Sequence, residues 1–151
     1  NLPVLVSGAT DGVVRIYARG GGGNLTYTGV AFTPFPGFAG AVRTAVGDVT
    51  GDGVVDYAFA TGPGTAARVR VINGVNGADV LGTTTVLGGF TGGAFVALGD
   101  LDRDGRAELA VAADAGGAPT VEVYRIASGR LTAVATFPAF NNGTTRGARV
   151  A

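Results

Sequence analysis

The sequence lacks four residue types that carry much of the chemistry of protein sites. Its 151 residues include no cysteine, histidine, methionine or tryptophan. Without cysteine there is neither a disulfide framework nor a thiolate metal site. Without histidine, the usual zinc ligand and the usual general base at neutral pH are both missing. These absences argue against a zinc site and against histidine-based catalysis.

Concentrated positive charge is also missing. The chain has no lysine, its 11 arginines are scattered singly, and its formal net charge is zero. A nucleic-acid-binding surface needs clustered basic residues, so we expect no nucleic-acid partner. No apolar run reaches the roughly 18 residues that span a bilayer, so we expect no membrane insertion.

Aromatic residues make up only 8% of the chain, whereas glycine occurs 28 times. Alanine, valine and threonine are frequent among the remaining residues. This composition suits many short strands joined by tight turns, and long helices are hard to build from it. The predicted fold class is therefore all-β.

Acidic residues are concentrated in two nine-residue windows, 48–56 and 100–108, which we call the first loop and the second loop. Gly53 and Gly105 each occupy the sixth position of their window, and the windows start 52 residues apart. Two windows in register indicate an internal repeat. The acids inside them are Asp48, Asp52, Asp56, Asp100, Asp102, Asp104 and Glu108.

The same order of apolar segments surrounds both loops. One short segment precedes each loop, three more follow it, and glycine-rich turns separate them. Alternation of apolar and polar residues predicts half-buried strands. The predicted strands of the two complete units are residues 41–46, 56–61, 68–72 and 81–87, followed by residues 94–98, 108–113, 120–126 and 131–137.

The two ends of the chain fit the same unit. Residues 3–6, 13–17 and 25–32 match its second, third and fourth strands, and residues 147–151 match its first strand. Four short strands with a period near 50 residues are typical of a β-propeller blade. We therefore predict three propeller blades of four antiparallel strands, one of them permuted between strand 1 and strand 2.

The predicted single repeat domain covers residues 1–151. Residues 1–40 hold strands 2–4 of the first blade, 41–92 and 93–140 are the second and third blades, and 141–151 supply strand 1 of the permuted blade. Propellers typically need about 4–8 blades to close a ring. We therefore expect either a part of a longer propeller or a homodimer that closes a six-bladed ring.

Both loops have a ligand spacing that suits calcium. A loop can wrap this ion with side-chain oxygens from positions 1, 3 and 5, a carbonyl from position 7 and a further carboxylate, and glycine at position 6 permits the sharp turn. We expect two calcium ions per chain, the tighter one in the second loop because of its extra charge. The predicted ligands are Asp48, Thr50, Asp52, the Val54 carbonyl and Asp56, and then Asp100, Asp102, Asp104, the Arg106 carbonyl and Glu108.

Two other interpretations of the loops are an EF-hand and an ordinary β-turn. An EF-hand needs a bidentate acid at position 12, where this sequence has Phe59 and Val111, and it needs helices where these flanks alternate as strands. Ordinary β-turns also use aspartate and glycine. Two loops in register, each with a carboxylate at the ninth position, favour a metal site over a plain turn.

The repeated segments resemble a known family. Val46-Gly-Asp-Val-Thr-Gly-Asp-Gly-Val-Val-Asp56 and Leu98-Gly-Asp-Leu-Asp-Arg-Asp-Gly-Arg-Ala-Glu108 are similar to FG-GAP repeats, also called VCBS repeats, the blades of integrin-α-type β-propellers. The resemblance covers essentially the whole chain and implies that each acidic loop joins the first two strands of a blade and holds calcium. Thr50 departs from the usual Asp or Asn, and the first unit has Leu2 in place of the ninth-position acid.

The resemblance implies scaffolding and recognition, by adhesion, by carbohydrate binding or by attachment to secreted enzymes. The leading hypothesis is a calcium-stabilised propeller module for binding or assembly, extracellular or secreted by a bacterium if natural. Its partner would be a second copy, the remaining blades of a longer chain, or a carbohydrate or protein ligand. The alternatives are a fragment of a secreted adhesion or lectin-like propeller, and an engineered propeller fragment with no evolved ligand.

A propeller hydrolase is the enzyme alternative, since paired carboxylates can act as acid and base. The loops already use every clustered acid, so we expect the protein not to be an enzyme. The remaining acids are isolated at turns or on an alternating strand, namely Asp11, Asp79, Asp114 and Glu122.

Overall fold

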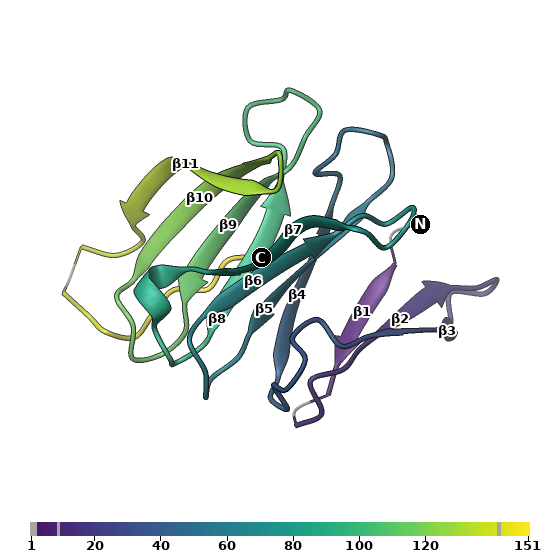
Figure 1. The fold of residues 1–151 in the computed structure, drawn as a ribbon, viewed down its shortest axis with the longest axis horizontal. Helices are drawn as coiled ribbons and strands as arrows, with labels where there is room; N and C mark the ends of the chain where they lie inside the picture. Colours follow the sequence, from purple (N-terminus) through teal and green to yellow (C-terminus); the bar gives the residue numbers. More distant parts are fainter. Residues whose placement is uncertain (1–2, 9, 142) are drawn as a thin grey trace.

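The protein consists of three antiparallel sheets that fan out side by side (Figure 1). The computed structural model describes residues 3–8, 10–141 and 143–151. Within each sheet the strands follow one another in chain order, so that every connection is a hairpin between neighbours. The predicted all-β fold of blade-like antiparallel sheets is confirmed. Leu2 lies outside the described residues.

The first sheet has three strands and the other two have four. The first contains β1 (Val4–Ser7), β2 (Val14–Arg19) and β3 (Leu25–Phe32). The second contains β4 (Val42–Gly47), β5 (Asp56–Thr61), β6 (Arg68–Ile72) and β7 (Asp79–Thr85). The third contains β8 (Ala94–Gly99), β9 (Glu108–Ala113), β10 (Thr120–Ala127) and β11 (Arg130–Pro138).

The second and third sheets pair their strands in the same register. Gly47 lies opposite Asp56 at the start of the β4–β5 ladder, and Gly99 lies opposite Glu108 at the start of the β8–β9 ladder. The Gly47–Asp56 pair and the Gly99–Glu108 pair therefore occupy equivalent positions in the second and third sheets. The spacing of the acidic loops thus corresponds to a real structural repeat, with each loop closing an equivalent ladder.

Small side chains allow the second and third sheets to pack closely. Ala58 and Ala60 of β5 and Val69 of β6 are 0% exposed, and they share one core with Leu109 and Val111 of β9. Because successive side chains of a strand point to opposite faces, the alternation of apolar residues places this set on one side of the second sheet. The largest core of the molecule therefore lies between two blades.

Larger side chains fill the junction between the first and second sheets. Phe59, which comes between Ala58 and Ala60, is 1% exposed and shares a core with Phe35 and Val14. Its ring centroid lies 6.0 Å from that of Phe32 on β3, in the tilted arrangement that aromatic pairs favour. The two faces of β5 thus hold two different blade junctions together.

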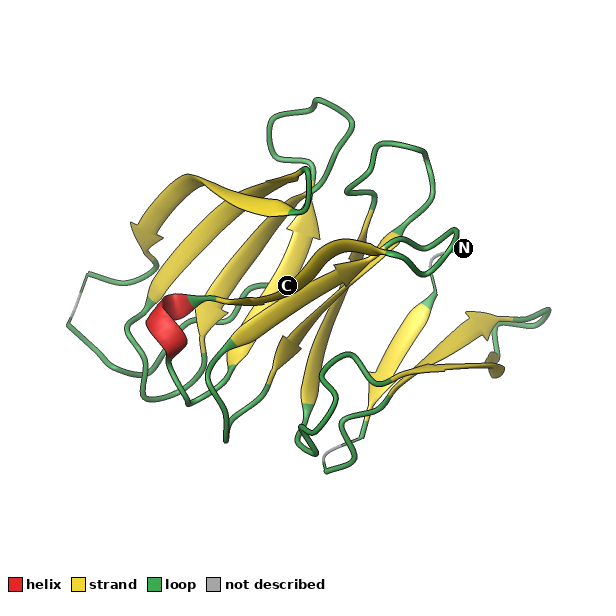
Figure 2. Ribbon diagram, in the orientation of Figure 1, coloured by secondary structure: helices red, strands yellow, loops and turns green. Residues whose placement is uncertain are grey.

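The fourth strand of the second sheet differs from the prediction by two residues at each end. It covers Asp79–Thr85, and a single 3-10 turn, η1 (Leu87–Gly89), follows it (Figure 2). Leu87 has a φ of 53°, which a strand residue does not adopt. Asp79 lies opposite Ile72 and also pairs with Arg70, so the strand starts earlier than its apolar residues indicated.

The last residues of the chain lie against the third sheet. The Ala148 N–H donates to the Ala113 carbonyl at 2.9 Å, and Ala148 and Val150 pack on Ala112 and Val121. Residues 147–151 are not paired as a strand, and they do not join the β1–β2–β3 sheet. Their assignment as strand 1 of a permuted blade, like the other domain boundaries, stays a prediction.

Among the residues that the structure describes, no helix is long and apolar enough to cross a membrane.

Replacing Phe59 with alanine is expected to lower the free energy of unfolding by about 3–5 kcal/mol, because the cavity would open inside a buried blade junction. Chemical denaturation followed by circular dichroism measures this change. The matched control is Val75→Ala, since Val75 is 64% exposed in a turn and its loss should stay within about 0.5 kcal/mol. Equal effects of the two substitutions would contradict the assigned core.

Candidate metal centre

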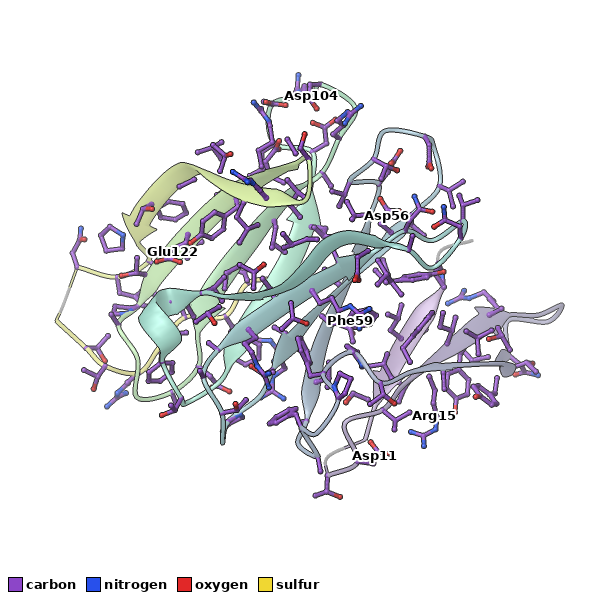
Figure 3. All side chains as sticks on the ribbon, viewed as in Figure 1. Asp11, Arg15, Asp56, Phe59, Asp104 and Glu122 are labelled. Carbon is purple, nitrogen blue, oxygen red and sulfur yellow. The ribbon has the colours of Figure 1, made fainter. Side chains whose placement is uncertain are left out.

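Both acidic loops project from the same edge of the molecule (Figure 3). The first loop joins β4 to β5, and the second loop joins β8 to β9. The two loops are also linked to each other, because the Ala107 N–H donates to the Asp48 carbonyl at 2.7 Å. Residues that are 52 positions apart in the repeat are thus brought to equivalent places at one edge.

The carboxylate at position 1 organises the turn of each loop. Asp48 accepts hydrogen bonds from the N–H groups of Gly51 at 2.6 Å and Gly53 at 2.7 Å. Asp100 accepts from Asp104 at 3.1 Å and from Gly105 at 3.0 Å. A carboxylate that collects successive N–H groups folds the backbone around itself. Both loops therefore have a defined shape that their own side chains impose.

The backbone of the loops is left-handed at two positions. Gly53 and Gly105, at position 6, have φ values of 83° and 88°, as the need for a sharp turn predicted. Position 4 is left-handed too, with φ values of 76° at Gly51 and 63° at Arg103. Sequence reasoning missed position 4, because only one of its two residues is a glycine.

At position 9 the first loop has a carboxylate that is fully satisfied by backbone groups. Asp56 is 0% exposed. Its Oδ2 accepts from Val49 at 2.9 Å and Thr50 at 3.0 Å, and its Oδ1 accepts from Gly74 at 3.0 Å. Asp56 therefore ties the loop to the turn between β6 and β7. Burial, and then the charge of Asp56, raise the pKa of the neighbouring Tyr57.

At position 9 the second loop has the longer acid Glu108, and one of its carboxylate oxygens accepts no hydrogen bond from the described residues. Glu108 is 3% exposed, and its Oε2 accepts from Leu101 at 2.9 Å. Its Oε1 is buried and has no hydrogen-bond donor among the described residues. A buried carboxylate oxygen without a donor is costly, so this atom fits a position where a cation would bind.

Three predicted ligands of the second loop are brought together. One carboxylate oxygen each from Asp100, Asp102 and Glu108 lies within 4.8 Å of the others. Calcium takes oxygen ligands at about 2.3–2.6 Å, so these three atoms can surround one ion. Asp104 is turned toward the backbone instead, since its Oδ1 accepts from the Arg106 N–H at 2.9 Å. The residues of this loop fit a calcium ion.

The predicted ligands of the first loop lie less close together. Within the residues that the structure describes, the carboxylates of Asp48, Asp52 and Asp56 do not converge as those of the second loop do. Asp52 Oδ1 accepts from the Val54 N–H at 2.8 Å, whereas Thr50 Oγ1 is buried without a hydrogen-bond partner. Thr50 is thus an available ligand at position 3. The carbonyl roles of Val54 and Arg106 stay predictions.

Sequence reasoning also missed a positive charge at the second loop. Arg125 on β10 forms an ion pair with Asp102, and its Nη2 lies 3.7 Å from Glu108 Oε1 and 4.0 Å from Asp104 Oδ2. Arg125 lies on an alternating strand, so nothing in the sequence near it pointed to the loop. Its position one residue beyond the Tyr124–Leu109 pair of the β9–β10 ladder becomes evident only from the strand register.

Comparison with known families agrees with this geometry. A family model described as FG-GAP-like repeat matches residues 48–111. Residues 48–111 are an FG-GAP-like repeat. The matched segment starts at position 1 of the first loop and ends inside β9, so this FG-GAP-like repeat contains both acidic loops. No curated protein and no solved structure matches the chain.

Replacing Asp56 with alanine is expected to destabilise the FG-GAP-like repeat more than replacing Glu108 does. Asp56→Ala leaves three buried or half-buried N–H groups without an acceptor, which costs about 3 kcal/mol or more. Glu108→Ala removes the acceptor of one N–H group. Denaturant unfolding of both variants in a chelator measures the difference, and a larger loss in Glu108→Ala would contradict the hydrogen bonds described here.

Proposed function

We propose that the protein is a calcium-stabilised β-propeller module that acts as a scaffold for binding or assembly. The observation that carries this proposal is the convergence of the Asp100, Asp102 and Glu108 carboxylates around a buried oxygen that lacks a donor. Carboxylates this close repel one another unless a positive charge lies between them. Calcium would supply that charge and fix the loop.

Calcium would stabilise the contact between neighbouring blades as well as the loop itself. Val49, at position 2 of the first loop, is 2% exposed in the core that the second and third sheets share. The hydrogen bond from Ala107 to the Asp48 carbonyl crosses the same junction. An ion that fixes either loop therefore also fixes part of a blade junction, which supports a structural role for calcium.

Calcium is expected to raise the melting temperature relative to a chelator. An ion that binds only the folded state contributes about 2.7 kcal/mol per site at 100 times its dissociation constant. For a chain of this length that corresponds to about 5 °C or more per site. Differential scanning calorimetry in calcium and in EDTA tests this, with magnesium at the same ionic strength as the control. Identical midpoints would refute occupied structural sites.

We further propose that the arc of three blades is completed by a second copy of the chain. Both end faces of the arc expose apolar side chains. On the first sheet Val4, Val6 and Tyr27 are 37%, 44% and 43% exposed. On the third sheet Phe137 is 47% exposed beside a hollow of about 460 Å³. Contacts between such faces would close a six-bladed ring and remove the open strand edges.

The different exposure of the residues at position 2 of the two loops supports a further blade packed on the third sheet. Val49 is 2% exposed because the third sheet covers it, whereas its counterpart Leu101 is 67% exposed. A further blade packed on the third sheet would cover Leu101 in the same way. That blade would come from a second copy or from the remaining blades of a longer chain.

Substituting an exposed end-face residue is expected to abolish association while leaving the chain folded. In sedimentation velocity the unmodified chain should have the mass of two copies, and Phe137→Asp should have the mass of one, because a charge cannot be buried in that junction. Val75→Asp is the control, since Val75 lies in a turn between β6 and β7. A monomer before any substitution would instead support a partner in a longer chain.

The isolated acids support a noncatalytic role. Asp11 pairs with Arg15, Asp79 with Arg70 and Asp114 with Arg43, at 2.7–3.0 Å. The Val13 N–H and Arg15 lower the pKa of Asp11. Glu122 accepts a hydrogen bond from the Tyr124 hydroxyl at 2.6 Å, and burial and this bond raise the pKa of Tyr124. Each isolated acid thus forms an ion pair or a hydrogen bond with a neighbouring side chain, and no two of these acids pair with each other as an acid and base would.

The location and the ligand of the protein are also part of this proposal. An extracellular or secreted location would supply the calcium that the loops need, and a carbohydrate or protein ligand would suit a scaffold of this kind. An engineered fragment without an evolved ligand would have the same loops. Calcium dependence tests the loops in either setting.

A further inference from the structure

A positive charge from a neighbouring strand lies against the second loop. Arg125, near the end of β10, contacts Asp102, and its Nη2 lies 3.7 Å from Glu108 Oε1 and 4.0 Å from Asp104 Oδ2. One guanidinium therefore lies near three of the four carboxylates of this loop. The fourth, Asp100, uses its two oxygens to accept the N–H groups of Asp104 and Gly105.

The first loop has no such charge at the equivalent place. Strand register puts Tyr57 opposite Ile72 in the second sheet and Leu109 opposite Tyr124 in the third. Asn73 follows Ile72 in the second sheet as Arg125 follows Tyr124 in the third, so the two residues are equivalent in the repeat. The Asn73 side chain is used in its own turn, where its Oδ1 accepts from Val75 at 2.8 Å and from Asn76 at 3.1 Å.

Two observations show that Arg125 occupies a cation position. Oxygens of Asp100, Asp102 and Glu108 converge within 4.8 Å, and Arg125 contacts two of these three residues. The Glu108 side chain is 3% exposed, and its Oε1 has no hydrogen-bond donor in the described chain. The nearest positive charge to this oxygen is the guanidinium, at a distance where it neutralises charge without donating a hydrogen bond.

We propose that Arg125 is an internal counter-ion that competes with the divalent cation for the second loop. This inference rests on the proposed calcium site. Without calcium, the guanidinium neutralises the carboxylates and holds the loop in shape. A calcium ion that enters must displace the guanidinium from Asp102 and Glu108 or bind beside a like charge. The second loop therefore binds calcium more weakly than its number of carboxylates predicts.

The test exchanges the two equivalent residues. In Arg125→Asn we expect the dissociation constant of one site to fall about tenfold or more, and the melting temperature in EDTA to fall as well, because the carboxylates lose their counter-ion. In Asn73→Arg we expect the dissociation constant of the other site to rise. Calcium titration by isothermal calorimetry and melting in EDTA measure both quantities. An Asp48→Asn background isolates the second loop.

Two further variants serve as controls. Arg125→Lys keeps the charge and should stay near the unmodified protein in both measurements. Arg130→Asn removes a positive charge from the same sheet, at the start of β11, and should leave both dissociation constants unchanged. An arginine with only a structural role would give the opposite sign in Arg125→Asn, with weaker calcium binding and lower stability together.

The outcomes separate the two proposals. If calcium binds and Arg125→Asn leaves both dissociation constants unchanged or raises them, competition is refuted while the calcium site stands. If neither the unmodified protein nor Arg125→Asn takes up calcium, the calcium site itself is refuted, and the competition with it. If the second loop binds calcium only in the Arg125→Asn variant, Arg125 excludes calcium from this loop in the unmodified protein, which supports the competition.

Discussion

The structure depends on a carboxylate that is buried where the second strand of a blade begins. Asp56 and Glu108 are 0% and 3% exposed, and each accepts a backbone N–H from position 2 of its own loop. Burial of an unpaired carboxylate would cost too much, so the loop must fold back over it. That fold sets how β4 leads into β5 and how β8 leads into β9. The shape of each blade edge thus follows from the need to satisfy one charge.

The two blades meet this need in different ways. Asp56 is short, and three backbone N–H groups from its loop and from the next turn satisfy both of its oxygens. Glu108 is one methylene longer, so its second oxygen extends past the backbone donors toward Arg125 and the other carboxylates. Backbone dipoles can satisfy one carboxylate, whereas three converging carboxylates need a full positive charge. The same backbone turn therefore supports two electrostatically different sites.

Much of the fold could be predicted from the sequence because the pattern is local and repeated. Alternation gave the strands, with β3, β5, β6 and β9 matching their predicted residues, and glycine at position 6 gave the loop turn. Effects that depend on residues distant in sequence could not be predicted. The contact of Arg125 with the second loop needs the β9–β10 register, and the full satisfaction of Asp56 needs Gly74 in another turn. Spacing predicts which residues can be ligands, but the register decides which charges meet them.

The first loop is covered by the blade that follows it, and the proposed assembly would cover the second loop in the same way. Val49 is buried because the third sheet covers the first loop, and Ala107 hydrogen-bonds to the Asp48 carbonyl across that junction. Leu101 has the same place in the second loop but is exposed. If another blade docks as proposed, a cation or guanidinium that fixes the second loop would order Leu101 beforehand and lower the entropic cost of docking. By reciprocity, a docked blade that orders the loop would raise the affinity of the loop for the cation by the same factor. Under the proposed assembly, cation binding at the second loop and ring closure would therefore be one coupled equilibrium.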